Sequence, residues 1–367
     1  MKSYLRFLSR NKLYTAIEVV GLSLALAFVI PMICFYTNIA RISKGHENYK
    51  NIYSLCVDYV QVSSPGFGDF LKERVPEIDK VTSPILNNVW YDIENTNRKI
   101  HYVDKDFFYF FPAKFSKGGI DFLDTPNSIA VSKEFADYLA KSGPVIGREI
   151  DHNSNRYIVN AVFDEYGSNV LSGCDILMNN EAIRKSGHND FIYGHRGSMT
   201  FFSVNPSEDM DEVKAKVKNT MIEFWGEEFR NAPYDLIRYD KITTDESAFI
   251  GIESNPTSML IILGILCVVL FSIPLLNYIN LSVALTTKRA KEMAMRKLNG
   301  ASQRNIIFKY CLESMTFTAI CFVFGLLLSD ITSDVWNSFM NNTGAGTGNM
   351  ALSWTPANII IFIALII

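Results

Sequence analysis

Three long stretches of this chain are almost wholly apolar, and they predict its architecture. They are residues 13–37, 257–281 and 306–328. At about 1.5 Å of rise per helical residue, each covers the roughly 30 Å of hydrocarbon in a bilayer. A fourth apolar run, 356–367, is too short to cross, and we expect the natural chain to continue beyond it. The pattern therefore predicts a transmembrane helical bundle of four spans, the last one incomplete.

Residues 38–256 follow a different pattern, that of a folded α/β domain. Apolar and polar residues alternate in short segments bounded by Gly, Pro, Asn or Asp, which is typical of strands. Ser132 is placed to cap a helix that ends near Gly143, and Ser207 to begin one that runs through Phe224. This inserted region is long enough to bury its own core and to divide into two subdomains. The predicted strands are 52–60, 99–103, 156–163 and 200–204.

Charge orients these segments. Residues 1–12 carry four bases and no acid, whereas residues 41–255 carry 24 bases and 33 acids. Because basic residues near span ends stay in the cytoplasm, we expect a cytoplasmic N-terminus and an extracytoplasmic domain. Residues 1–12 would be an amphipathic lead-in at the inner surface. A cleaved signal peptide is the alternative for 13–37, but that run exceeds the usual apolar length and no clear cleavage site follows.

The segment 282–305 between the second and third spans is basic and predicted to be helical. Six Lys or Arg and one Glu lie between Lys288 and Asn305, and Glu292 lies between Arg289 and Arg296 where ion pairing supports a helix. Gly300 is suited to a left-handed stop. From spacing alone, an amphipathic helix resting on anionic lipid remains open.

The sequence NYINLSVALTTKRAKEMAMRKLNGAS, however, resembles the coupling region of MacB/FtsX-type ABC transporter permeases. In that family the short helix docks onto the ATPase subunit. The resemblance thus implies an ATPase-coupling role for a set of nine residues. They are Lys288, Arg289, Lys291, Glu292, Met293, Met295, Arg296, Lys297 and Gly300.

The large inserted region resembles the same family, in the same order. The segments NIYSLCVDYV, FLKERVPEID and VDKDFFYFFPAKFSKG are similar to its opening strand, first helix and Phe-rich segment. The later blocks TPNSIAVSKEFADYLAKSGPVIGREI and YIVNAVFDEY are similar too, whereas residues 181–250 match only in type. The resemblance implies a MacB-like periplasmic core domain of two subdomains, one inserted in the other.

Two carboxylates fall inside predicted spans. Glu18 lies near the cytoplasmic end of the first, and Glu313 lies four residues after Lys309 in the third, where the two side chains are placed to pair. An intramembrane carboxylate marks a candidate functional site, although packing or coupling contacts explain both. Residues 329–355, with Trp336 and Trp354, are predicted to form an external loop with interfacial aromatics.

The cysteines allow one disulfide. Cys56 and Cys174 would both face the oxidising side, so a bridge between them is open, with two buried thiols as the alternative. The other four, Cys34, Cys267, Cys311 and Cys321, lie in apolar spans.

Candidate enzyme chemistry is weak. The chain has no phosphate-binding Gly-x-x-x-x-Gly-Lys loop, and His188, Asp190 and His195 lack the spacing of a metal site. Ser63 and Ser64, with His101 and Asp104 downstream, form no recognisable nucleophile set. We therefore expect no metal, no cofactor and no catalytic centre in this chain.

The function expected from the resemblance is that of a permease subunit that converts ATP hydrolysis elsewhere into movement of its periplasmic domain. Expected partners are a dimeric cytoplasmic ABC ATPase, a second permease unit (a second copy or a tandem repeat) and a periplasmic or outer-membrane protein, with no nucleic acid. Export of peptides or drugs, lipoprotein extraction and control of an envelope enzyme fit equally. A membrane-anchored sensor and a tethered external enzyme are the alternatives.

Overall fold

The computed structural model divides the chain into two compact units. One is Met1–Ala40 with Thr257–Ile367, and the other is Arg41–Pro256. Each is described by itself. The residues that the structure describes are 12–61, 63–153, 155–166, 171, 173–181, 198–249, 257–284, 290, 293–295, 297–343 and 352–366.

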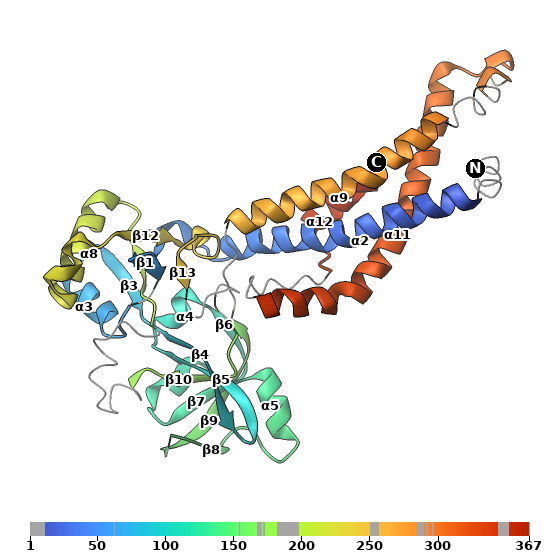
Figure 1. The fold of residues 1–367 in the computed structure, drawn as a ribbon. Helices are drawn as coiled ribbons and strands as arrows, with labels where there is room; N and C mark the ends of the chain where they lie inside the picture. The colour runs from blue at the N-terminus through green and yellow to red at the C-terminus, as the bar shows by residue number, and fades with distance from the viewer. Residues whose placement is uncertain are drawn as a thin grey trace. The chain divides into compact units, whose positions relative to one another are not determined.

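The first unit is helical (Figure 1). Among the described residues, three helices are long and apolar enough to cross a membrane, over Thr15–Arg41, Thr257–Asn277 and Gln303–Ser333. This confirms the three long apolar runs as helices, while the fourth apolar helix is shorter and the count of four spans stays a prediction. The helices are α2 (Lys12–Ser43), α9 (Thr257–Ala284), α11 (Gln303–Thr343) and α12 (Pro356–Ile366).

The predicted loop 329–355 is wrong in its first half, because α11 continues to Thr343. Residues 329–343 contain neither Gly nor Pro, so nothing interrupts the helix before Gly344. The polar side chains suit the helix as well: the Thr332 hydroxyl donates to the carbonyl of Leu328 at 2.9 Å. The side chain of Trp336 lies outside the described part, whereas Trp354 packs edge-on against Phe362 with ring centroids 6.0 Å apart.

Close packing of α2 against α11 forms the main core of the helical unit. Leu26, Ile30, Phe317 and Cys321 are buried there with neighbours from α12. Gly325 makes this possible, since a Cβ atom on it would lie 2.8 Å from Leu26 Cβ and 3.3 Å from the carbonyl oxygen of Ser23. Small residues allow such close approach of helices in membranes.

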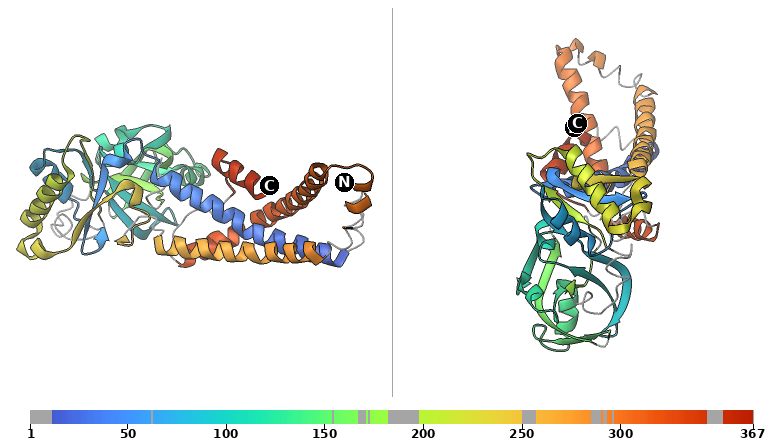
Figure 2. Two further views of the ribbon diagram at one scale, coloured as in Figure 1. Left: turned by 90° about the horizontal axis from the view of Figure 1, so that it is seen from above. Right: turned by 90° about the vertical axis from the view of Figure 1, so that its left-hand side faces the viewer.

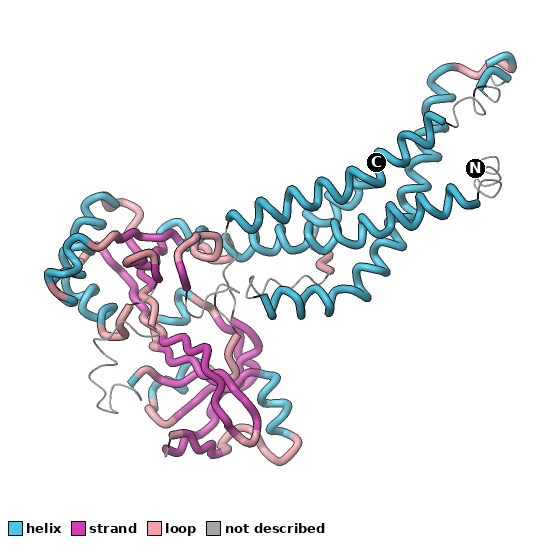
Figure 3. Tube along the Cα trace, in the orientation of Figure 1, coloured by secondary structure: helices cyan, strands magenta, loops and turns pink. Residues whose placement is uncertain are grey.

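The second unit contains all the described strands (Figure 3), arranged in two sheets. In the six-stranded sheet, β13-β2-β1-β11-β3 lie in that order and β12 also pairs with β1. Helices α3 (Phe67–Arg74) and α8 (Met210–Trp225) pack on it through a core that includes Phe67, Phe202 and Val217. The strands are β1 (Ile52–Val57), β2 (Val60–Gln61), β3 (Ile78–Thr82), β11 (Phe201–Val204), β12 (Tyr234–Arg238) and β13 (Ala248–Phe249).

The seven-stranded sheet has the order β4-β5-β10-β7-β9-β6, with β8 also paired to β9. It curls so that β4 reaches β8, where Tyr91 and His152 stack edge to face at 4.9 Å. Helix α5 (Lys133–Ala140) packs on this sheet, and the short helix α4 (Phe107–Phe110) follows β5. The strands are β4 (Ile85–Ile93), β5 (Thr96–Val103), β6 (Ala113–Lys117), β7 (Ser128–Ser132), β8 (Glu149–His152), β9 (Asn155–Tyr166) and β10 (Ile176–Asn179).

The chain order shows that one sheet is inserted in the other. Strands β4 to β10 all fall between β3 and β11, which are antiparallel neighbours in the six-stranded sheet. The segments predicted as strands are found as β1, β5, β9 and β11, although β1 and β11 are buried along almost their whole length.

The two predicted helix caps had different outcomes. Ser132 caps α5 as expected, since its hydroxyl accepts from the Phe135 amide at 3.2 Å. The Ser207 cap is wrong, because α8 begins at Met210 and Asp209 is its N-cap. The amide of Glu208 donates to the carbonyl of Asn205, so the chain is still turning at Ser207 and the helix begins later.

Candidate functional site

The proposed coupling segment is described only in part. Met293 and Met295 lie in helical turns, Lys297 follows, and Gly300 has φ +83°, which confirms the left-handed stop. The Asn299 amide donates to the Met295 carbonyl at 3.1 Å and closes the last turn. Lys288, Arg289, Lys291, Glu292 and Arg296 lie outside the described residues.

The described tip of this segment is apolar and exposed. Met295 is 60% exposed and Leu298 is 81% exposed. Large exposed apolar side chains are found at surfaces that contact another protein or a membrane. Sequence reasoning placed Met295 in the coupling set, whereas it assigned Leu298 only to the apolar face of the helix.

The predicted Lys309–Glu313 pair is present on α11. The Lys309 ammonium lies 3.4 Å from the Glu313 carboxylate, one helical turn away. Glu313 is only 7% exposed, so the ion pair explains how a carboxylate is accommodated there. Glu18 is half-buried on α2.

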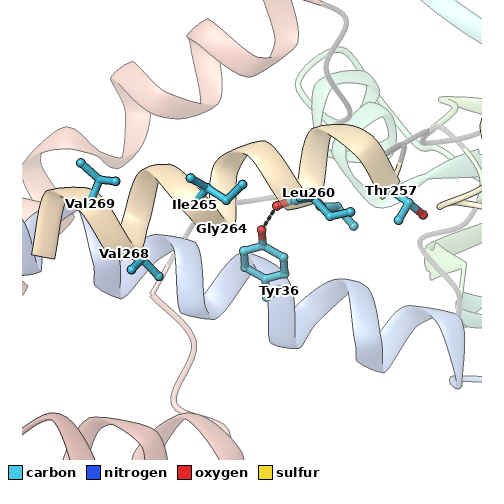
Figure 4. Close-up of a pocket in the computed structure, with 8 residues that line it drawn as sticks. Tyr36, Thr257, Leu260, Gly264, Ile265, Val268 and Val269 are labelled. Atoms are coloured by element: carbon cyan, nitrogen blue, oxygen red, sulfur yellow. Dashed lines mark hydrogen bonds between the residues drawn. The ribbon is translucent and has the colours of Figure 1, made fainter. Parts of the chain in front are cut away.

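A groove runs between α2 and α9, which lie side by side (Figure 2). The Tyr36 hydroxyl donates to the carbonyl oxygen of Leu260 across the groove (Figure 4). Gly264 leaves the space, because a Cβ atom there would lie 3.1 Å from that hydroxyl. The groove has a volume of about 570 Å³, and the rest of its wall is apolar apart from Thr257.

Sequence reasoning did not find Tyr36. Its signal was a single glycine, Gly264, within a run of large apolar side chains, which indicates close contact with a neighbouring helix.

The disulfide left open between Cys56 and Cys174 is not formed. Cys56 is a buried thiol in the core beneath β1, and Cys174 is partly buried against that same core. Burial raises the pKa of the Cys56 thiol, and a hydrogen bond with Ser247 lowers it in part. A group less readily ionised is a poorer nucleophile, so Cys56 serves packing.

The described residues test part of the candidate enzyme chemistry. They contain no group of three or more His, Cys, Asp or Glu able to hold a metal ion. Ser63 and Ser64 are both fully buried, so a substrate does not reach them. His188, Asp190 and His195 lie outside the described part of the chain.

Two buried ionisable groups of the α/β unit respond to pH in opposite directions. Burial lowers the pKa of His101 to about 3, with Lys99 adding to the effect. Burial also raises the pKa of Asp104 to about 6, although hydrogen bonds from Thr82, Ser83 and Phe107 oppose the rise. His101 has a pKa near 6.5 in the unfolded chain, so the folded state loses stability as the pH falls below about 6.5. Asp104 has a pKa near 4 in the unfolded chain, so the folded state loses stability as the pH rises from about 4 through 6.

We therefore expect Asp104→Asn to make the stability of the α/β unit newly acid-sensitive. In this variant the pH dependence from Asp104 no longer offsets that from His101. The free energy of unfolding therefore falls by up to about 1.4 kcal/mol for each unit by which the pH is lowered from 6 to 4. Urea unfolding followed by Trp fluorescence measures this slope. His101→Gln is the matched control and gives the opposite slope; identical pH profiles for the two variants would contradict the assignment.

Helices able to cross a membrane, together with a folded α/β unit inserted between the first and second, define a membrane protein with a large domain outside the bilayer. Family models identify its two parts. Residues 15–220 match the MacB-like periplasmic core domain, and residues 259–367 match the FtsX-like permease C-terminal region. The chain belongs to the MacB/FtsX-type ABC transporter permeases.

Three solved structures resemble part of the chain. A domain of a permease-like protein from Porphyromonas gingivalis is 14% identical, with a TM-score of 0.44 over 53% of this chain and 92% of its own. The periplasmic region of MacB from Actinobacillus actinomycetemcomitans is 10% identical, with a TM-score of 0.39 over 52% and 90%. The extracellular domain of the ABC-type transporter YknZ from Gram-positive bacteria is 12% identical, with a TM-score of 0.36 over 51% and 100%. The comparison with curated proteins finds no match.

Membership of this family makes the chain an ABC transporter permease component. It is an inner-membrane protein with a periplasmic domain, and permeases of this family work with a cytoplasmic ABC ATPase. The earlier resemblance to this family is thereby confirmed.

Proposed function

We propose that this permease works by mechanotransmission, in which ATP binding and hydrolysis by a separate cytoplasmic ATPase dimer move the periplasmic domain. The observation that carries the proposal is the insertion of a large folded domain between the first two spans, with the exposed apolar side chains of Met295 and Leu298 following the second. Packed helices that have two discrete arrangements transmit rigid-body motion from one end to the other.

The polar groups of the spans support a mechanical role. Several hydroxyls in the described helices bond to their own backbone: Ser272 donates to the Val268 carbonyl at 2.6 Å, and Thr316 to the Leu312 carbonyl at 2.7 Å. Side chains satisfied in this way offer little to line a path for a polar solute. We infer that the cargo is handled on the periplasmic side.

The proposed topology places the N-terminus and residues 282–305 in the cytoplasm and residues 38–256 in the periplasm, as basic residues near span ends favour. The two sheets would be the two subdomains of the periplasmic region. Two permease units are expected per complex, because an ATPase dimer presents two docking sites. Export of peptides or drugs, extraction of lipoproteins and control of an envelope partner are the proposed tasks.

Co-purification tests the proposal. The full-length protein is isolated from native membranes in mild detergent, and the accompanying proteins are identified by mass spectrometry. We expect an ATPase with a phosphate-binding loop, and ATP turnover by the complex above background. If neither is found, the sensor interpretation takes precedence, and residues 288–305 become a lipid-facing basic turn.

A further inference from the structure

The chain crosses between the two sheets of the periplasmic domain at two places, and both are lined by buried polar side chains. The outgoing crossing follows Thr82 at the end of β3, and the returning one runs from Ser198 to Thr200 before β11. Ser63, Ser198 and Thr200 are fully buried. Buried hydroxyls are costly unless hydrogen-bonded, so their gathering at the crossings calls for a physical reason.

Ser83 is the centre of this cluster. Its hydroxyl lies 3.0 Å from that of Thr200, which in turn lies 2.6 Å from the Ser63 hydroxyl. Its carbonyl accepts from the side-chain Nδ2 of Asn180 and from the Ser198 hydroxyl, each at 3.2 Å. The outgoing and returning crossings are therefore bonded directly to each other.

Helix α3 fits closely over the same point. A Cβ atom on Gly68 would lie 2.3 Å from the Ser83 hydroxyl oxygen and 2.9 Å from Val81 Cγ1. Because glycine has no side chain, the helix approaches the crossing without displacing Ser83.

Asp104 adds a carboxylate from the other sheet. It follows directly after β5, and it accepts from the Thr82 hydroxyl at 2.8 and 2.9 Å and from the Ser83 amide at 3.2 Å. The Phe107 amide donates to it at 2.9 Å and fixes the turn. All of these partners are donors, which suits an ionised carboxylate, and such bonds are the strong ones.

Asp106 makes a second link two residues later. Its carboxylate pairs with Lys72 of α3 at 3.2 Å and with Lys80 of β3 at 3.3 Å. These pairs are partly exposed and contribute less than the buried bonds. The two carboxylates at the end of β5, in the seven-stranded sheet, thus bind strand β3 of the six-stranded sheet and helix α3, which packs on that sheet.

We propose that Thr82, Ser83, Asp104, Asn180, Ser198 and Thr200 form a rigid clasp that makes the two sheets move as a single body. This inference rests on the proposed mechanical function, since a domain that bent at the crossings would absorb the movement delivered to it. Apolar contacts are non-directional and allow sliding, whereas hydrogen bonds away from water fix one orientation.

The test uses the full-length protein in detergent and hydrogen–deuterium exchange read by mass spectrometry. Thr82→Val keeps the volume of a side chain that is 1% exposed and removes the hydroxyl on Asp104, whereas Thr82→Ser keeps the hydroxyl. We expect at least tenfold faster exchange in peptides covering 82–85 and 198–201 for Thr82→Val, and unchanged exchange at β7. Thr82→Ser is expected to exchange as the natural protein does.

Unchanged exchange at the crossings in Thr82→Val would overturn the clasp, as would equally faster exchange at β7, which indicates general loosening. A second arm uses the complex with its ATPase. Protection at the crossings is expected to be the same without nucleotide and with bound ATP; a difference of tenfold or more would make the crossings a hinge. The first arm needs no ATPase, so its failure is distinct from a failure of the proposed function.

Discussion

Replacing Arg296 and Lys297 together by Glu is expected to abolish association with the ATPase while leaving membrane insertion and the periplasmic fold intact. The change converts two positive charges into two negative ones next to Met295 and Leu298, whose apolar side chains are exposed in the described part of the segment. Like charges placed opposite a complementary surface cost several kcal/mol, enough for at least a hundredfold loss of affinity. Quantitative co-purification of the ATPase measures this loss.

A control variant should also replace two basic residues by Glu, on the same side of the membrane but outside the coupling set. Arg10→Glu with Lys12→Glu does so, since both residues lie in the N-terminal lead-in, outside the segment 282–305, and the proposed topology places them in the cytoplasm as well. This pair is expected to keep most of the ATPase. Equal association of both double variants with the ATPase would remove the coupling role from residues 288–300.

The second large effect is expected from Gly325→Leu, which should separate α2 from α11. Even one carbon at this position would lie 2.8 Å from Leu26 Cβ, which the backbone holds in place, so the helices themselves must move. Overpacking of this kind costs about 1–3 kcal/mol or more. We expect a lower melting temperature in detergent and a newly reactive Cys321, which is fully buried in the interface.

Gly21 supplies the matched control on the same pair of helices. A Cβ atom there meets nothing within 4 Å, so Gly21→Ala is expected to be neutral or to stabilise, by up to about 1 kcal/mol from helix propensity. Gly325→Ala should lie between the two. Maleimide labelling of Cys321 reports the outcome, with the exposed Cys311 as the internal standard. Slow labelling of Cys321 in Gly325→Leu would show that this contact does not hold the helices together.

Local patterns that carry their own physical cause were read correctly. An uncharged run predicts a membrane helix because the bilayer tolerates few charges, and α9 followed from that alone. Ser132 was identified as a cap because its hydroxyl bonds an amide three residues away. The cap of α8 was missed because Ser207 and Asp209 both satisfy the capping rule, and the end of α11 was missed because residues 329–343 contain neither Gly nor Pro to stop the helix.

The sequence by itself determined the membrane helices, the alternating strands, the family and the basic segment between the second and third spans. Each of these depends on residues close together in the chain or on charge near a span end. Only the tertiary structure decided that α2 packs closely against Gly325 and that the Tyr36 hydroxyl bonds to α9. It also decided that Asp104 accepts a hydrogen bond from Thr82 where the chain crosses between the two sheets. These contacts join residues far apart in sequence, so their partners are fixed by packing, which no local pattern specifies.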